Sequence, residues 1–358
     1  MTDILPAGSV IGILGGGQLG RMLSVAASRL GYRCHIYDPS PEPPAGHVAE
    51  HITTAPWDDA DALAQFAARV DVITFEFENI PTATLDLLEP LRPIRPGRRA
   101  LSVSQDRLTE KEFLRGLGLE TAPFAPVNSA DELALAVADI GTPAILKTRR
   151  MGYDGKGQAR IDTAADIQPA WDAMQGAPAI LEGFVTFSQE ISVIAARGLI
   201  GEVAAFDPGE NVHEAGILRE TRVPARLNGR QRSDAVLLAA KILNALDYVG
   251  VLGVELFVTS DGLIVNEIAP RVHNSGHWTQ NGCSTDQFEQ HIRAVAGLPL
   301  GDGGRHADVV MENLIGDDLN RVPELLRTRD VAVHLYGKPE MRAGRKMGHV
   351  NRIIRQER

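Results

Sequence analysis

Two apolar segments on either side of a short polar turn constrain the fold of this chain more than any other feature. Residues 251–259 (Val-Leu-Gly-Val-Glu-Leu-Phe-Val-Thr) and 263–269 (Leu-Ile-Val-Asn-Glu-Ile-Ala) have the composition of β-strands. The intervening Ser-Asp-Gly, residues 260–262, is typical of a hairpin turn that ends in glycine. Because the length of a hairpin turn determines which residues face each other, the sequence predicts the pairing register of the two strands.

The register predicts a metal site. Pairing Thr259 with Leu263 and counting away from the turn places Glu255 directly opposite Glu267. Carboxylates on facing positions repel each other, and a divalent cation between them removes that penalty. Mg²⁺ typically binds one or two carboxylates together with nucleotide phosphates. Asn266 points to the other face unless a bulge brings its amide to the metal. The alternative is a register shifted by one residue, with one glutamate facing solvent.

The N-terminal part of the chain alternates strand-like and helix-like segments. Apolar runs bounded by turn residues predict strands, and apolar residues at helical spacing predict helices between them. Such alternation implies a parallel sheet, and hence an α/β domain. The predicted strands are 9–14, 33–37 and 72–77, and the predicted helices are 18–30 and 58–69.

The pattern changes after the Pro/Arg-rich stretch 90–99, which is typical of a linker. A chain of 358 residues is too long for one ordinary core, so two or three domains are expected. Beyond the linker we expect helices at 109–117 and 233–246, strands at 144–148, 179–185 and 190–196, and several short strands between 308 and 354.

Charge and cysteine content exclude several classes of protein. The formal net charge of −10 argues against a nucleic-acid-binding protein, which needs a basic surface. Cys34 and Cys283 have neither metal-ligand spacing nor a disulfide framework, as expected in a reducing cytoplasm. The apolar run at residues 10–14 is too short for a signal or membrane-spanning helix, so no membrane association is expected.

The segment Gly15-Gly-Gly17-Gln18-Leu19-Gly20 follows a predicted strand and opens a predicted helix. Glycines let the backbone approach a phosphate, and a helix N-terminus offers N–H donors. Asp38, at the end of the next strand, lies near the spacing of the ribose-binding acid in dinucleotide folds. A nicotinamide site and a plain tight turn are alternatives. We favour the phosphate of a smaller substrate, with Glu76 as a further contact at a strand end, because the second half of the chain carries its own nucleotide site.

That nucleotide site begins at Lys147, which ends a predicted strand and precedes a glycine-rich loop containing Lys156. The loop lacks Walker A spacing but has what a mobile phosphate cover requires: glycines for close approach and lysines as cations. A plain hairpin with solvated charges is the alternative. Glu182-Gly183-Phe184-Val185 then offers an extended backbone for an adenine edge, and Glu190 a carboxylate for ribose hydroxyls. Each signal is weak when considered alone.

Taken in order, these segments resemble the ATP-grasp superfamily. Within it, the chain resembles the N5-carboxyaminoimidazole ribonucleotide synthetase family of purine biosynthesis. The resemblance covers nearly the whole chain, and its most specific string runs from Asn266 to Trp278 (Asn-Glu-Ile-Ala-Pro-Arg-Val-His-Asn-Ser-Gly-His-Trp). Val272 departs from the proline expected there, which leaves the flanking Arg271 and His273 usable. The other matching segments are 15–22, 75–79, 152–158 and 342–349.

The resemblance implies an α/β ATP-grasp fold with a Rossmann-like N-terminal domain (1–104), an ATP-grasp region (105–296) with a mobile lid (125–187), and a small C-terminal β-rich segment (297–358) that completes the substrate site. It also implies a reaction. ATP phosphorylates bicarbonate to carboxyphosphate, whose carboxyl unit passes to the amine of 5-aminoimidazole ribonucleotide. The co-substrate is ATP, the metal is Mg²⁺ with Mn²⁺ as an alternative, and the assembly is a homodimer in the cytoplasm.

The family's functional residues carry over to positions that match its motifs. Expected ATP contacts are Arg107, Lys147, Gly152, Tyr153, Asp154, Gly155, Lys156, Gly157, Gln158, Glu182, Gly183, Phe184, Val185, Glu190, His213, Asn266 and Glu267. Expected metal ligands are Glu255 and Glu267, and expected catalytic residues are Arg271, His273 and Lys338. Expected substrate contacts are Gly17, Gln18, Leu19, Asp38, Glu76, Asn274, Lys338, Arg345 and Lys346.

Several alternatives stay open. Within the ligases, a purine-synthesis enzyme that uses formate or another acid would share these segments. The interpretation of the chain as an NAD-dependent oxidoreductase is supported by the glycine loop and Asp38 alone. His273 is either a general acid/base or a purely hydrogen-bonding residue between Arg271 and Asn274.

Overall fold

The computed structural model describes residues 4–152 and 157–354 and contains three sheets. The N-terminal sheet is parallel, with strand order β3-β2-β1-β4. Its first strand consists of apolar residues and one glycine, and its helices pack apolar faces on the sheet. The elements of this part are β1 (Val10–Leu14), α1 (Gln18–Arg29), β2 (Arg33–Tyr37), β3 (His51–Thr53), α2 (Ala60–Ala67), β4 (Val72–Phe75), α3 (Thr82–Leu88) and α4 (Arg98–Ser104).

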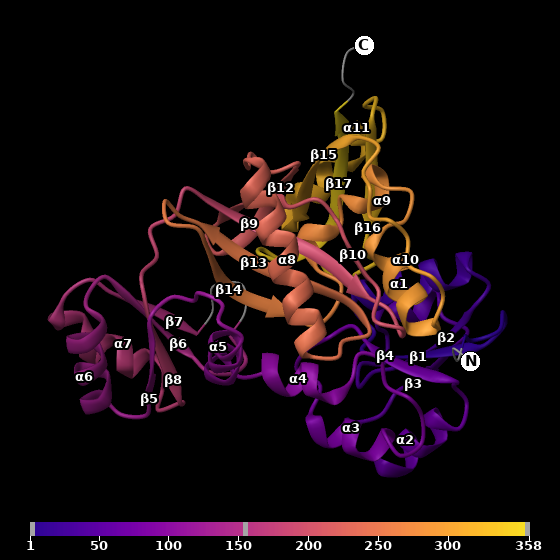
Figure 1. Cartoon of the computed structure of the whole chain (residues 1–358). Coiled ribbons are helices and arrows are strands. Elements are labelled where there is room, and N and C mark those ends of the chain that lie inside the picture. Colours follow the sequence, from indigo (N-terminus) through magenta and orange to yellow (C-terminus); the bar gives the residue numbers. More distant parts are fainter. Residues whose placement is uncertain (1–3, 153–156, 355–358) are drawn as a thin grey trace.

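The next part of the chain builds a small antiparallel sheet of order β5-β8-β6-β7. Helices α6 and α7 share a hydrophobic core with these strands, and this unit stands at the left of the molecule in Figure 1. Helix α5 lies between it and the rest of the molecule (Figure 1). The elements are α5 (Arg107–Gly116), β5 (Phe124–Val127), α6 (Ala130–Ile140), β6 (Ala144–Thr148), β7 (Gln158–Ile161), α7 (Ile167–Ala173) and β8 (Ala179–Gly183).

The largest sheet has nine strands in the order β14-β13-β9-β11-β12-β15-β17-β16, with β10 paired to β9. The strands are β9 (Gln189–Arg197), β10 (Val203–Ala205), β11 (Gly209–Glu214), β12 (Ile217–Val223), β13 (Gly250–Val258), β14 (Leu263–Ala269), β15 (Asp308–Ile315), β16 (Val331–Leu335) and β17 (Lys346–Ile354). The helices of this part are α8 (Gly229–Ala245), α9 (Thr279–Gly282), α10 (Gln287–Ala296) and α11 (Val322–Leu325).

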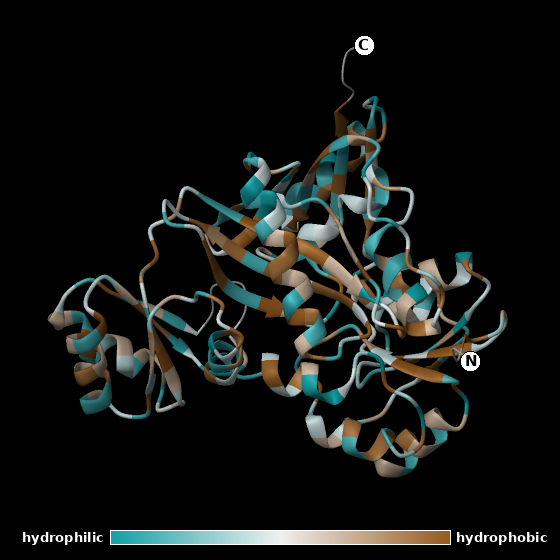
Figure 2. Ribbon diagram, viewed as in Figure 1, coloured by the Kyte–Doolittle hydropathy of each residue, from teal (hydrophilic) through white to brown (hydrophobic). Residues whose placement is uncertain are grey.

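Strand β9 shows how this sheet forms two cores. Ile191, Val193 and Ala195 pack with α8, whereas Ile194 and Ala196 pack with α10 and α1. Because successive side chains of a strand point to opposite faces, one apolar strand serves both layers. Hydrophobic colouring accordingly concentrates on the central strands in Figure 2.

The β-rich C-terminal strands continue the nine-stranded sheet, because β12 pairs with β15 over Glu220–Val223 and residues 309–312. The C-terminal strands and the glutamate hairpin therefore belong to one continuous sheet and lie at its opposite ends. None of the helices among the described residues is long and apolar enough to cross a bilayer.

The predicted α/β class is confirmed, and the predicted elements occur with ends displaced by a few residues. The predicted helix at 233–246 begins earlier, at Gly229, because Asn228 caps it: its side chain accepts from Gln231, and Gln231 reciprocates. The predicted strand at 72–77 ends earlier, at Phe75.

Candidate active site

The two glutamates of the β13–β14 hairpin face each other, as predicted: Glu255 pairs with Glu267. The turn itself differs from the prediction, because Leu263 pairs with Val258 and not with Thr259. A bulge at Asn266, between the pairs Glu255–Glu267 and Leu256–Val265, restores the expected opposition. The bulge also brings the Asn266 amide to a hydrogen bond with the Glu255 carboxyl.

The two carboxylates have opposite electrostatic environments. Burial raises the pKa of Glu255 well above its usual value, and the charges of Glu267 and Glu190 raise it further. Burial also acts to raise the pKa of Glu267, but the guanidinium of Arg107, 3.0 Å from Glu267 Oε2, and the ammonium of Lys147 hold it below the usual value. The crowded acids at Glu255 are what a divalent cation would relieve, so the donor set fits a hard metal ion.

Three charged residues on one face of α5 hold the bulged strand. Arg107 contacts Glu267, Lys111 Nζ donates to the backbone carbonyl of Asn266 at 2.6 Å, and Ile268 N–H donates to Glu110 Oε1 at 2.6 Å. Glu110 and Lys111 are both buried. The sequence interpretation missed these two residues. Their signal was charge at helical spacing from Arg107, on a face that also carries buried Leu114.

Lys147 and Glu182 come from the neighbouring strands β6 and β8. Lys147 Nζ donates to Glu182 Oε2 at 2.9 Å, and Lys111 Nζ lies 3.5 Å from the same oxygen. Burial acts to raise the pKa of Glu182, but the two ammonium groups lower it to about 2. Lys111 therefore connects the β5–β8 sheet to the β13–β14 hairpin.

Glu190 and His213 lie beside Glu255 from the neighbouring strands β9 and β11. His213 Nδ1 is 3.3 Å from Glu190 Oε2, and one ligand atom from each of the three residues lies within 4.8 Å of the others. Glu255 is therefore shared between the hairpin pair and a second set of donors that includes an imidazole.

Arg271 and His273 follow β14 on the same side. The Arg271 guanidinium forms a bidentate ion pair with Glu78, with NH2 2.8 Å from Oε1, and so links the hairpin to the end of the N-terminal sheet. His273 Nε2 lies 3.5 Å from Glu255 Oε1. Burial first, and then the charge of Arg271, lower the pKa of His273 to about 3, so its ring is neutral near pH 7. Glu78 was missed by the sequence interpretation, which selected Glu76.

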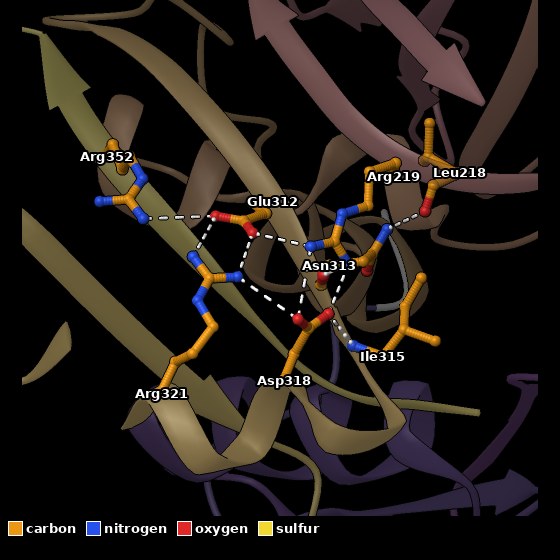
Figure 3. A network of polar contacts seen from close by, with 8 residues as sticks. All are labelled: Leu218, Arg219, Glu312, Asn313, Ile315, Asp318, Arg321 and Arg352. Atoms are coloured by element: carbon orange, nitrogen blue, oxygen red, sulfur yellow. Dashed lines mark hydrogen bonds and ion pairs between the residues drawn. The ribbon is translucent and has the colours of Figure 1, made fainter. Parts of the chain in front are cut away.

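The side-chain amide of Asn274 forms hydrogen bonds with another side chain of the protein, that of Asn313. Asn274 Nδ2 donates to Asn313 Oδ1 at 2.9 Å, and Asn313 Nδ2 returns a bond of 2.8 Å to Asn274 Oδ1. Asn313 is joined to the charged network shown in Figure 3. Arg219 donates a hydrogen bond to the Asn313 carbonyl and forms ion pairs with Glu312 and Asp318. Arg321 and Arg352 complete the network around Glu312 (Figure 3).

The N-terminal glycine loop is held by the two acids predicted to meet substrate. Gly16 N–H donates to Asp38 Oδ2 at 2.7 Å, Gly17 N–H to Glu76 Oε1 at 2.6 Å, and Gly20 N–H to Glu76 Oε2 at 2.8 Å. Asp38 and Glu76 directly follow β2 and β4, the two strands that flank β1, so both reach the start of α1. The loop amides at these three glycines are therefore engaged by the chain itself, and Gln18 and Leu19 form the first turn of α1 beside them.

The basic residues of the C-terminal loop meet the N-terminal domain. Gly337 lies against Arg21 and His47, which places Lys338 near α1. Lys338 Nζ donates to the Lys346 carbonyl at 2.8 Å and lies 5.5 Å from the centre of the Tyr336 ring. Arg345 NH1 donates to the Glu340 carbonyl at 3.0 Å.

The glycine-rich loop after β6 is only partly described. Tyr153, Asp154, Gly155 and Lys156 lie outside the described residues. The Gly152 carbonyl accepts from Arg107 NH2 at 3.3 Å, and Gly157 has φ of +68°, which favours glycine. Gln158 pairs with Lys147 across the β6–β7 ladder. Gly183 and Phe184 donate their N–H groups to Pro123 and Pro143, and Val185 follows at the exit of β8.

Comparison with known proteins decides the family. The ribonucleotide synthetase pre-ATP-grasp domain model matches residues 9–105, the ATP-grasp domain model 112–288, and the phosphoribosylaminoimidazole carboxylase C-terminal domain model 309–358. The N5-carboxyaminoimidazole ribonucleotide synthase of Brucella melitensis is 55% identical over 98% of both chains. The chain belongs to the N5-carboxyaminoimidazole ribonucleotide synthetase family.

Other members of this family agree in sequence and structure. The Bacillus subtilis synthase is 44% identical over 97% of this chain and 92% of its own. The crystal structure of the Thermus thermophilus synthetase superposes with a TM-score of 0.91 at 45% identity, covering 96% of this chain and 93% of that one. An ADP complex of a further synthetase superposes with a TM-score of 0.96 at 42% identity, covering 99% and 94%.

The family membership establishes an ATP-dependent ligase of purine biosynthesis and leaves the nicotinamide interpretation of the N-terminal loop without support. Within this family's fold, the structure brings Glu255, Lys147, Arg271 and His273 together around Glu267.

Proposed function

We infer that this chain uses ATP to join bicarbonate to the amine of 5-aminoimidazole ribonucleotide, yielding N5-carboxyaminoimidazole ribonucleotide, ADP and phosphate. The observation that carries this function is the 55% identity to a named synthase over 98% of both chains. The Aspergillus clavatus synthase, 32% identical over 99% of this chain and 95% of its own, was crystallised with ADP and 5-aminoimidazole ribonucleotide. These compounds are one product and one substrate of the proposed reaction.

The reaction proceeds in two steps. A bicarbonate oxygen attacks the γ-phosphorus of ATP, the bond to the β-phosphate oxygen breaks, and carboxyphosphate and ADP form. The carboxyphosphate C–O bond then breaks, releasing phosphate, and the amine nitrogen bonds to the carboxyl carbon while its proton passes to the departing phosphate. Arg271 and His273 line the place proposed for bicarbonate, and Arg271 supplies a fixed positive charge there.

We propose Glu255 and Glu267 as the ligands of Mg²⁺, with Mn²⁺ as an alternative. Their facing positions and the raised pKa of Glu255 support this assignment. A bound divalent cation would neutralise charge on the ATP phosphates during transfer. Asn266, turned by the bulge toward Glu255, orients one of the two carboxylates.

The proposed ATP site lies between the lid sheet and the hairpin. Lys147 and Arg107 supply positive charge for phosphates, the exit of β8 from Glu182 to Val185 supplies the adenine edge, and Glu190 with His213 supplies ribose contacts. Glu190 and His213 lie beside Glu255, so the proposed ribose contacts are next to the proposed metal ligand. The segment from Gly152 to Gln158 covers the phosphates in this proposal.

The proposed ribonucleotide site lies between the N-terminal and C-terminal parts. Lys338, Arg345 and Lys346 supply charge for its phosphate beside the first turn of α1, with Gln18 and Leu19. The carboxylates of Asp38 and Glu76 accept hydrogen bonds from the amides of Gly16 and Gly17. In this proposal they influence the substrate by fixing the conformation of the loop. Lys338 would contact the substrate directly and so serve catalysis. Asn274, held by Asn313, positions the turn that carries His273.

We also propose the organisation of the molecule: a Rossmann-like domain at 1–104, an ATP-grasp region at 105–296 with its lid at 125–187, and a C-terminal segment at 297–358. The assembly in this proposal is a homodimer in the cytoplasm, with no nucleic-acid or membrane partner. Light scattering coupled to size-exclusion chromatography tests the dimer, which a mass near the 38.6 kDa of one chain would contradict.

An ADP-release assay tests the function. We expect ADP to form at a substantial rate only when Mg²⁺, bicarbonate and 5-aminoimidazole ribonucleotide are present together. Equal turnover with formate in place of bicarbonate would reject carboxylation and favour a formate-using ligase. Tight NADH binding without ATP binding would reject the ligase as a whole.

A further inference from the structure

His273 ends a short chain of buried hydroxyl groups. Ser192 Oγ, on β9, donates to Ser275 Oγ at 2.6 Å, and Ser275 Oγ lies 2.8 Å from His273 Nδ1. Both serines are almost fully buried, with 2% and 1% of their surface exposed. Hydroxyls so deeply buried have few partners for their hydrogens, so the directions of these bonds can be worked out from the neighbouring groups.

Counting hydrogens determines the tautomer of His273. A serine hydroxyl has one hydrogen, and among the described residues Ser275 Oγ is the one partner of Ser192 Oγ, so the hydrogen of Ser192 is satisfied there. The hydrogen of Ser275 is in turn satisfied only at His273 Nδ1, which is then the unprotonated nitrogen of the ring. In a neutral imidazole the single proton is then on Nε2.

The other side of the ring accommodates the same arrangement. His273 Nε2 lies 3.5 Å from Glu255 Oε1, and a carboxyl oxygen can accept the Nε2 hydrogen.

The ring cannot easily turn over to exchange its nitrogens. The Gln287 amide holds the His273 backbone on both sides, accepting from His273 N–H at 2.9 Å and donating to its carbonyl at 2.8 Å. Gly253 packs beneath the ring so closely that a Cβ there would lie 2.8 Å from His273 Cβ. Packing therefore fixes the ring's orientation, and the serines fix its proton.

We propose that Ser275, oriented by Ser192, is a positioning residue that keeps His273 in the Nε2–H tautomer, so that His273 serves the reaction as a hydrogen-bond donor beside Glu255 and not as a proton acceptor. The proposal deepens the proposed function and rests on it for the role of His273 in turnover. The tautomer itself does not depend on that function.

The direct test is ¹⁵N NMR of the protein labelled at histidine, recorded without substrates. The ring signals that disappear in the His273→Gln protein belong to His273. We expect a protonated Nε2 and an unprotonated Nδ1 in the wild type, a small shift toward the other tautomer in Ser192→Ala, and a larger shift in Ser275→Ala. A wild-type His273 protonated on Nδ1 would overturn the proposal even where the Ser275 variant fails to fold.

Steady-state kinetics give a second, independent readout. Loss of a residue that orients a reacting group typically lowers activity about 10- to 100-fold, and we expect such a fall in kcat for Ser275→Ala with little change in KM for ATP. Ser192→Ala, which leaves the Ser275–His273 bond in place, is the matched control and should lose less. His273→Gln, whose amide N–H can replace the Nε2 donor, should retain more activity than His273→Ala.

The two readouts separate two kinds of failure. An unchanged His273 tautomer in folded Ser275→Ala, or equal activity losses in the two serine variants, would overturn the positioning role. A correct tautomer combined with full activity of His273→Ala would instead show that His273 has no part in the reaction, which would count against the proposed bicarbonate pocket.

Discussion

The ammonium of Lys111 donates a hydrogen bond to the backbone carbonyl of Asn266, 2.6 Å away, at the bulge that turns Glu267 toward Glu255. Lys111 is buried and also lies 3.5 Å from Glu182 on β8. One side chain of α5 therefore joins the glutamate hairpin, which we propose binds the metal, to the strand proposed to bind adenine.

Replacing Lys111 with methionine should destabilise the protein, because removal of one partner leaves buried polar groups unpaired. Loss of one member of a buried ion pair typically costs about 3–5 kcal/mol, and we expect a loss at the lower end because Lys147 still neutralises Glu182. Urea unfolding measures this change. Lys241→Met on α8 provides a control for the loss of a lysine charge, and an equal midpoint for the two variants would contradict the role of Lys111.

Glu267→Gln should leave the fold intact and lower turnover by at least about 100-fold, since charge neutralisation by a bound metal contributes several kcal/mol to such reactions. The measurement is kcat over a Mg²⁺ titration together with circular dichroism. Glu324→Gln is the control for removing one carboxylate, because Glu324 is exposed and lies outside the site. Normal turnover of Glu267→Gln at low Mg²⁺ would refute the metal assignment.

Glu110 makes the stability depend on pH in a defined window. Burial first, and then the charge of Glu267, raise the pKa of this carboxyl from 4.5 to about 8. The folded state thus binds a proton that the unfolded state has lost, so stability falls as the pH rises from about 4.5 to 8. Glu110→Gln mimics the protonated form and should flatten this part of the curve of unfolding free energy against pH. Glu112→Gln, exposed on the same helix, should not.

Gly253→Ala should reduce activity by displacing His273. The new Cβ would lie 2.8 Å from His273 Cβ and 3.0 Å from Cγ, and overpacking of this kind typically costs about 1–3 kcal/mol. Thermal unfolding and kcat, measured together, should both decrease. Gly229→Ala, where an added Cβ meets nothing within 4 Å, is the matched control. Full activity with an unchanged melting temperature would show that the ring can move without consequence.

The hairpin shows how far local sequence determined the prediction and where it failed. Turn composition predicted the strands, and the Glu255–Glu267 pair is correct, but the pairing next to the turn is shifted by one residue and the bulge at Asn266 cancels the shift. The carbonyl at that bulge bonds to Lys111, 155 residues earlier in the chain. A contact between residues so far apart in sequence cannot be inferred from the local residue pattern of the hairpin.

The glycine loop and Asn274 illustrate a second limit. Residue types predicted ligand contacts there, but the Asp38 and Glu76 carboxylates bond to the loop amides, and the Asn274 amide bonds to Asn313. The Asp38 and Glu76 carboxylates reach the loop amides because the strand order places β2 and β4 on either side of β1. Composition and periodicity predict strands, but they do not predict such neighbours.

The continuation of the nine-stranded sheet into the C-terminal strands has a consequence for biosynthesis of the enzyme. Because β12 pairs with β15, and β15 with β17, one edge of the central sheet stays open until residues 308–354 have left the ribosome. The loop that carries Lys338 is among these late segments. A nascent chain can therefore pair strands β9 to β14 before the proposed ribonucleotide site is complete, so folding of the sheet core does not have to await that site.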